Sequence, residues 1–127
     1  MRRAHRPSIR EAQKELTRER LLDAAQTAFA ENGYINVTID DIVQRASAAR
    51  GTFYLYFDTK AEIFQAVLKN IGFRDQYEAL VVRLNTIKTP TVDTLQAWFE
   101  DLVDVYKANR AFHRATHEAR ASKEFLL

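Results

Sequence analysis

The chain has 127 residues, of which 46% are hydrophobic and 28% charged, enough for one packed domain or a small domain joined to part of a second. It contains no cysteine, which excludes disulfide bonds, thiolate catalysis and cysteine-ligated zinc. No apolar run approaches the roughly 20 residues of a membrane span, and the basic N-terminus lacks the apolar segment of a signal peptide, so we expect a cytoplasmic protein.

The net charge of +2 is unevenly distributed. The first ten residues contain four arginines and no acidic residue. Such an arm either keeps the protein soluble or contacts phosphate. These arginines are Arg2, Arg3, Arg6 and Arg10.

No set of residues indicates an enzyme or a metal site. His113 and His117 are four residues apart, but their polar surroundings favour an exposed helix face over a pair of metal ligands. Glu62, Asp75 and Glu78 are scattered and do not converge on a nucleophile. We therefore expect no catalytic residues, no cofactor and no metal.

The first helix is predicted from about Arg18, where apolar residues such as Leu22 and Phe29 recur at intervals of three and four. Gly33 is predicted to end it, because glycine adopts a positive φ at little cost. A short extended connector is expected over residues 34–37.

Two short helices are predicted within residues 38–57. Thr38 is a typical N-cap, and Asp41 stands at the third position of a capping box. After the turn Ser47-Ala48-Ala49, Arg50 opens the second helix, which is expected to reach about residue 57. This is the size and spacing of a helix-turn-helix.

The rest of the chain is also predicted to be helical. Thr59 caps the next helix, and a bend or break is expected near Gly72, beyond which the apolar stripe is rotated. Pro90 stops that segment and Thr91 caps a further amphipathic helix. The stretch 109–127 is only weakly amphipathic, with no obvious terminal structure.

The segment GTFYLYF at residues 51–57 concentrates four aromatic rings. Phe53 and Phe57 are four residues apart and share a helix face, so we predict that both are core. Tyr54 and Tyr56 lie about 160° apart around a helix, so they cannot both be core. Each tyrosine offers a hydroxyl on a rigid stem, which can reach a phosphate oxygen.

Neighbouring residues favour the same partner. Arg50 and Thr52 stand in the first turn of a helix that could present them to base edges, and Gly51 allows close approach to a backbone. Lys60 opens the following helix at its positive end, an unfavourable place for a cation unless an anion binds there. The hydroxyl and amides at Thr38 offer a second phosphate-binding position.

Residues 18–68, RERLLDAAQTAFAENGYINVTIDDIVQRASAARGTFYLYFDTKAEIFQAVL, resemble the DNA-binding head of the TetR/AcrR family of bacterial transcriptional regulators. GTFYLYFDTKAEIF is the most specific part. The resemblance implies an all-α homodimer whose three N-terminal helices bind operator DNA and whose C-terminal helices form an effector pocket and a dimer interface. A small-molecule effector would shift the helix that begins at Lys60 and so separate the two recognition helices.

The resemblance also assigns residues to roles. Arg50 and Thr52 are the candidate base readers, because arginine suits guanine. The N-terminal arginines could add phosphate or minor-groove contacts. The family's usual DNA-contact positions fall on Thr38, Arg50, Gly51, Thr52, Tyr54, Tyr56 and Lys60, and its core positions on Phe29, Ile42, Phe53 and Phe57. The candidate lining of the effector pocket, for which ordinary interhelical core is an equal alternative, is Phe73, Tyr77, Trp98, Phe99, Leu102 and Tyr106.

Two departures from the family pattern matter. Ser47-Ala48-Ala49 replaces the common Gly-Val-Ser turn, so glycine's conformational freedom and a capping hydroxyl are both lost. The chain is also shorter than family members usually are, so it is either a fragment or a naturally short protein. We expect an arm at 1–17, a helix-turn-helix domain at 18–59, and at 60–127 the truncated start of a ligand-binding and dimerisation domain.

The leading hypothesis is therefore a sequence-specific regulator of transcription: a cytoplasmic, nucleoid-associated repressor released from a palindromic DNA operator by a small-molecule effector. A homodimer is expected of the full-length protein, and no membrane partner is expected. The alternative hypothesis is a helical ligand-binding or protein-interaction module that has lost operator binding.

Overall fold

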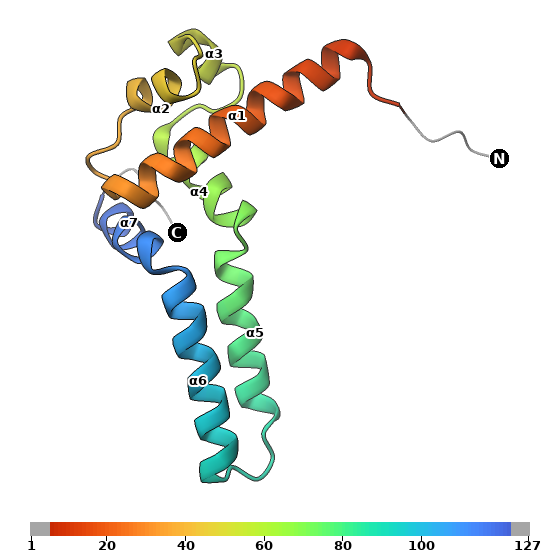
Figure 1. Ribbon diagram of the computed structural model, residues 1–127, viewed down its shortest axis with the longest axis vertical. Helices are drawn as coiled ribbons and strands as arrows, with labels where there is room; N and C mark the ends of the chain where they lie inside the picture. The colour runs from red at the N-terminus through yellow and green to blue at the C-terminus, as the bar shows by residue number, and fades with distance from the viewer. Residues whose placement is uncertain (1–5, 123–127) are drawn as a thin grey trace, which may run out of the picture.

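The computed structural model describes residues 6–122, which contain seven α-helices and no strand (Figure 1). The predicted all-α fold is thereby confirmed. Arg2 and Arg3 lie outside the described residues. The helices are α1 (Ile9–Asn32), α2 (Ile39–Arg45), α3 (Arg50–Tyr54), α4 (Lys60–Asn70), α5 (Phe73–Thr86), α6 (Val92–Ala108) and α7 (Arg110–Ala121).

Helix α1 begins earlier than the sequence pattern predicted. It starts at Ile9, where the Ser8 hydroxyl accepts a hydrogen bond from the Glu11 amide and the Glu11 carboxylate accepts one from the Ser8 amide. This capping box stabilises the N-terminus although the first two turns are exposed on every side. The prediction of a start near Arg18 was wrong because it relied on apolar periodicity, which these turns lack.

Helices α1 to α4 pack around one apolar core. Phe29, Phe53 and Phe64 are fully buried, and Phe29 contacts Phe64 edge to face at a centroid distance of 4.9 Å. Burying each such ring stabilises the fold by about 1.5–3 kcal/mol. The expected extended connector over 34–37 is instead a turn over residues 33–36, and it places the buried Tyr34 beside Phe64.

Helices α5 and α6 form a long antiparallel hairpin that extends away from the α1–α4 core (Figure 1). The expected break occurs at Gly72, whose φ of 68° lies in the left-handed region. Thr91 caps α6 as predicted, through reciprocal hydrogen bonds with Thr94. The predicted apolar stripe of α6 has no buried member.

Helix α7 returns to the core, although the sequence pattern of this region was only weakly amphipathic. Phe112, Ala115 and Ala119 are buried and belong to the same apolar cluster as α1. Their spacing of three and four places them on one face of α7. None of the described helices combines the length and apolar character required to cross a membrane.

Candidate nucleic-acid interface

The N-terminus of α2 is closed by the predicted capping box. The Thr38 hydroxyl accepts from the Asp41 amide at 3.1 Å, and Asp41 Oδ2 accepts from the Thr38 amide at 2.9 Å. The hydrogen bond from the Thr38 backbone, followed by that with its side chain, lowers the pKa of Asp41 below its ordinary value. Thr38 remains exposed, so its position fits the predicted phosphate contact.

The turn between α2 and α3 shows the effect of the missing glycine. Ser47 adopts a φ of 53°, the one positive φ of a non-glycine residue among residues 6–122. Ala49 is the N-cap of α3 and makes no side-chain capping hydrogen bond. The two consequences that the sequence indicated are therefore present: a residue other than glycine has a positive φ, and the N-terminus of α3 has no capping hydroxyl.

A contact that the sequence pattern did not reveal supports this turn. Arg20 of α1 donates from Nη2 to the carbonyl oxygen of Ala46 at 2.6 Å. Ala46 is the C-cap of α2, so the bond satisfies a helix-end carbonyl and anchors the turn to α1. Because Arg20 lies 26 residues away in sequence, only the tertiary fold brings the two together.

Helix α3 is anchored by the two predicted core rings. Phe53 is 0% and Phe57 3% exposed. The helix ends at Tyr54, earlier than expected, but the Phe57 amide still donates to the Phe53 carbonyl at 3.0 Å, so the helical path continues into the turn. Packing of the two phenylalanines therefore fixes which face of α3 is left for a partner.

Four of the seven predicted contact residues belong to α3. Arg50, Gly51 and Tyr54 are exposed, and Thr52 is half-buried. A Cβ on Gly51 would meet nothing within 4 Å, so this part of α3 is open to close approach. Tyr56 is half-buried against the core and Tyr54 is exposed, so the two tyrosines are not both core, as predicted, and their phosphate contacts stay predictions.

Arg50 is held by neighbours within the head. Its Nη1 donates to Asp40 Oδ1 at 2.7 Å, and its Nη2 donates to the Tyr54 hydroxyl at 3.3 Å. The hydrogen bond to Asp40, ahead of that to Tyr54, raises the pKa of Arg50 above its ordinary value. The sequence pattern did not indicate Asp40 as a partner of Arg50, because helix periodicity alone does not place α2 beside α3.

Lys60 has an internal role that the sequence did not suggest. Its Nζ donates to the Tyr34 carbonyl at 3.0 Å and lies 4.2 Å from the centre of the Tyr34 ring. These contacts stabilise a cation at the positive end of α4 without an external anion. The phosphate contact of Lys60 stays a prediction, and it would require the ammonium to turn away from Tyr34.

The basic residues before the head belong partly to α1. Arg6 precedes the helix and Arg10 lies in its first turn, and both are exposed. Further along α1, the Arg18 guanidinium lies 5.3 Å from the centre of the Phe57 ring. In Figure 1 this end of α1 projects beyond the other helices.

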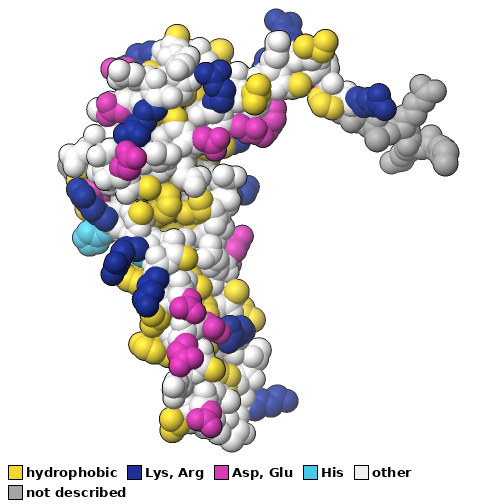
Figure 2. Space-filling model, viewed as in Figure 1, with side chains coloured by type: hydrophobic (Ala, Val, Ile, Leu, Met, Phe, Trp, Pro, Cys, Tyr) yellow, Lys and Arg dark blue, Asp and Glu magenta, His cyan; other side chains and the backbone are white. Residues whose placement is uncertain are grey.

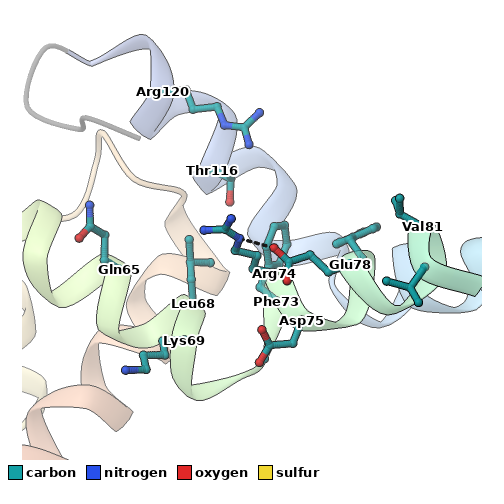
Figure 3. Close-up of a pocket in the computed structure, with 13 residues that line it drawn as sticks. Gln65, Leu68, Lys69, Phe73, Arg74, Asp75, Glu78, Val81, Thr116 and Arg120 are labelled. Carbon is teal, nitrogen blue, oxygen red and sulfur yellow. Dashed lines mark hydrogen bonds and ion pairs between the residues drawn. The ribbon is translucent and has the colours of Figure 1, made fainter.

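A groove between α4, α5 and α7 contains two of the six predicted pocket residues (Figure 3). Phe73 and Tyr77 line it together with Leu68 and Thr116. The Thr116 hydroxyl is buried and has no hydrogen-bond partner within the described part of the chain. A hydroxyl in this condition favours a ligand or a further polar group in the groove.

The other predicted pocket residues, Trp98, Phe99, Leu102 and Tyr106, lie outside the groove lining. Trp98 Nε1 donates to the Leu80 carbonyl at 2.7 Å, and Phe99 is 58% exposed. Figure 2 shows apolar side chains on the surface of the α5–α6 hairpin, and Val81, Val82, Leu95 and Tyr106 are among the exposed apolar residues.

His113 does not lie on the exposed face expected for it. Its ring stacks on Tyr106 at a centroid distance of 4.4 Å, and its Nε2 is 2.7 Å from the Tyr77 hydroxyl. Burial lowers the pKa of His113 and raises that of Tyr77. His117 is exposed, as predicted, and no group of three or more His, Asp or Glu side chains within residues 6–122 is arranged to hold a metal.

Comparison with known proteins matches this arrangement to one class. Residues 21–67, which span the C-terminal half of α1, all of α2 and α3 and most of α4, match the family described as bacterial regulatory proteins, tetR family. A solved structure, the Clostridium perfringens putative fatty acid metabolism regulator, superimposes with a TM-score of 0.55 at 29% identity, over 79% of this chain and 53% of that one.

Two curated relatives come from Pseudomonas putida. The HTH-type transcriptional regulator SrpR is 34% identical over 92 residues, covering 62% of this chain and 43% of SrpR. TtgW, an uncharacterized HTH-type transcriptional regulator, is 33% identical over 92 residues, covering 62% of this chain and 69% of TtgW.

These matches define a helix-turn-helix regulatory protein of the bacterial type. The chain belongs to the TetR family. Its matched region spans less than half the length of SrpR.

Proposed function

We propose that this chain is the DNA-binding head and part of the regulatory domain of a transcriptional repressor. The outer face of α3, with Arg50, Thr52 and Tyr54 displayed over the buried Phe53 and Phe57, is the observation that supports this most directly. A short helix held in this way can enter the major groove, where arginine and threonine contact base edges.

The proposed phosphate contacts are made by residues around the outer face of α3. Thr38 and Tyr54 are exposed on either side of the helix-turn-helix, and Arg6 and Arg10 extend from the N-terminal end of α1. Lys60 would add its charge once released from Tyr34. Contacts of this kind position a protein on the duplex and make its affinity depend on salt.

In the full-length protein we propose a homodimer on a palindromic operator, released by a small-molecule effector. The groove beside Phe73, Tyr77 and Thr116 is the part of the effector site that this chain supplies. Dimer symmetry would place two α3 helices in successive major grooves of one duplex face. We infer no enzymatic role and a location with the nucleoid in the cytoplasm.

Fluorescence anisotropy tests the proposal. The 127-residue chain is titrated with DNA from upstream of its own gene and with a scrambled duplex, over a series of salt concentrations. Preferential binding to the upstream DNA, with a salt slope of about −0.9 per phosphate contacted, is the expected result.

The outcomes separate the two candidate functions. Weak and equal binding to both duplexes would support a DNA-binding head that has no paired second head. Absence of binding even at low salt would contradict the proposal and favour a helical interaction module, for which the uncapped Ala49 and the positive φ of Ser47 are the structural reasons.

A further inference from the structure

Both peptide groups of Tyr34 are bound by side chains from other helices. Its N–H donates to Glu118 Oε1 of α7 at 3.2 Å, and its carbonyl oxygen accepts from Lys60 Nζ, the first residue of α4, at 3.0 Å. Tyr34 lies in the turn that connects α1 to α2. The orientation of this turn determines where Thr38 and the N-terminus of α2 begin.

Glu118 lies where a carboxylate is unfavourable by helix electrostatics alone. It approaches the C-terminal end of α1, which carries a partial negative charge, and the last turn of α1 contains no basic residue. Its side chain is only 16% exposed, and Arg114 is 3.7 Å from its second oxygen. A carboxylate placed against the dipole must therefore be held by specific contacts, and the Tyr34 amide is one of them.

The backbone at Gly33 is adapted to Glu118. A Cβ at this position would overlap Glu118 Oε1 and lie 3.2 Å from Arg114 Nε. Glycine therefore does two things here: it adopts the φ of 77° that ends α1, and it leaves room for the carboxylate to reach the Tyr34 amide.

Helix α7 contacts the α5–α6 hairpin through a different part of its surface. His113, five residues before Glu118, stacks on Tyr106 of α6 and is hydrogen-bonded to Tyr77 of α5. Five residues correspond to about 140° around a helix, so the two contacts lie on largely opposite sides of α7. In Figure 1, α7 lies between the α5–α6 hairpin and the end of α1.

We propose that Glu118 is a positioning residue that couples α7 to the DNA-facing surface through the Tyr34 amide. A displacement of α7 by a ligand in the groove beside Thr116 moves Glu118, releases the α1–α2 turn and changes the orientation of α2. Only the expected change in DNA affinity rests on the proposed function. The effect of Glu118 on the α1–α2 turn is independent of DNA.

The test compares Glu118→Ala with Glu118→Gln in the 127-residue chain, with Asp104→Asn, an exposed residue of α6, as the charge-matched control. Amide hydrogen exchange is measured for residues 34–45 and for α5 and α6. Loss of a hydrogen bond to a charged group should accelerate exchange in 34–45 about tenfold in Glu118→Ala. Glu118→Gln, which keeps an acceptor, should show about a two- to fivefold effect.

DNA affinity, measured by anisotropy on the upstream duplex, is the second readout. Glu118→Ala should weaken binding about fivefold, with exchange in α5 and α6 unchanged, whereas Asp104→Asn should change neither. Unchanged exchange in residues 34–45 of Glu118→Ala would overturn the proposal. Faster exchange with unchanged DNA affinity would also overturn it, since the turn would then be loosened without any effect on the DNA-facing surface.

Failure of the proposed function is distinguishable from failure of this inference. If the unsubstituted chain binds no DNA, the proposed function is wrong, and exchange in α2 alone then decides whether Glu118 positions that helix. If Glu118→Ala does not fold, Glu118→Gln decides: exchange in residues 34–45 that equals that of the unsubstituted chain contradicts the coupling.

Discussion

Arg50 and Asp40 form a 2.7 Å ion pair that joins the first residue of α3 to the second residue of α2. Both side chains are more than half exposed, so water screens the pair and its contribution to folding stability is small. Under the proposed function, its importance would lie in DNA selection. Before Arg50 can contact a base it must leave Asp40, and a non-cognate site that offers no guanine gives nothing in exchange.

Asp40→Asn is therefore expected to reduce selectivity. Removing the carboxylate frees Arg50 for any phosphate and removes a charge that repels DNA, so affinity for a scrambled duplex should rise about two- to fivefold. Affinity for the upstream duplex should rise less. Anisotropy titrations at one salt concentration measure both, with Asp93→Asn on α6 as the control. An equal rise for the two duplexes would show that Asp40 acts only through long-range charge.

Arg50→Ala and Tyr54→Phe should have different signatures. Loss of a base contact by Arg50→Ala should relax preference at one base position of each half-site, by roughly tenfold. Tyr54→Phe removes only a hydroxyl, so it should weaken all sequences alike. Binding to a panel of single-base variants of the upstream site separates the two. Uniform weakening by Arg50→Ala would show that Arg50 contacts phosphate instead.

Ala49→Ser should stabilise the head. Ala49 has the extended backbone of an N-cap, with φ −81° and ψ 153°, but lacks a hydroxyl to accept from an amide in the first turn of α3. Adding one should raise the free energy of unfolding by about 1 kcal/mol. Urea unfolding measures the change, and Ala111→Ser, at an exposed position within α7, is the control. A destabilised Ala49→Ser protein would mean that the turn cannot accommodate the hydroxyl.

Gly33→Ala should destabilise the protein for two separable reasons. An alanine at φ 77° and ψ −158°, a combination essentially restricted to glycine, is strained by about 1–3 kcal/mol, and its Cβ would overlap Glu118. In a Glu118→Ala background the overlap with Glu118 is removed, and the backbone strain and the close approach to Arg114 remain, so the cost of Gly33→Ala should be smaller there. A double-mutant cycle in urea measures this difference, and a cost equal in both backgrounds would exclude the steric contribution.

Stability should decrease on mild acidification because of His113. Burial lowers the folded-state pKa of His113 below its unfolded value of about 6.5, so the folded state binds fewer protons. The folding stability that the neutral His113 ring contributes is fully present above the unfolded-state pKa. It is lost as the pH falls through the folded-state pKa. Unfolding free energies at about pH 7.5 and about pH 5.5 should therefore differ less in His113→Phe than in the unsubstituted chain. His117→Ala, at an exposed position, should keep the full difference.

Local signals in the sequence predicted the helix-turn-helix well. Thr38 with Asp41, Gly33, Gly72 and Thr91 each mark a helix end through the chemistry of one to four adjacent residues, and the structure confirms all of them. The same holds for the buried Phe53 and Phe57, whose spacing fixes a shared face.

Contacts between distant helices could not be predicted in this way. Lys60 was interpreted as a cation in need of an external anion because the sequence does not place Tyr34 beside it, and Glu118 was not singled out because its partner is 84 residues away. His113 appeared exposed since its immediate neighbours are polar, whereas the rings that cover it come from α5 and α6. The DNA-contact and pocket assignments themselves stay predictions.

Helix α1 has a mechanical consequence that follows from its length. Its 24 residues form a rod of about 36 Å, and its buried residues all lie between Leu21 and Phe29. The N-terminal half of α1 is therefore a rigid extension of the packed C-terminal half and moves with it. A tilt of about 10° at the packed half would move the tip by about 3 Å over a length of roughly 18 Å. Small adjustments beside Glu118 would therefore be amplified at the end of the protein that carries Arg6 and Arg10.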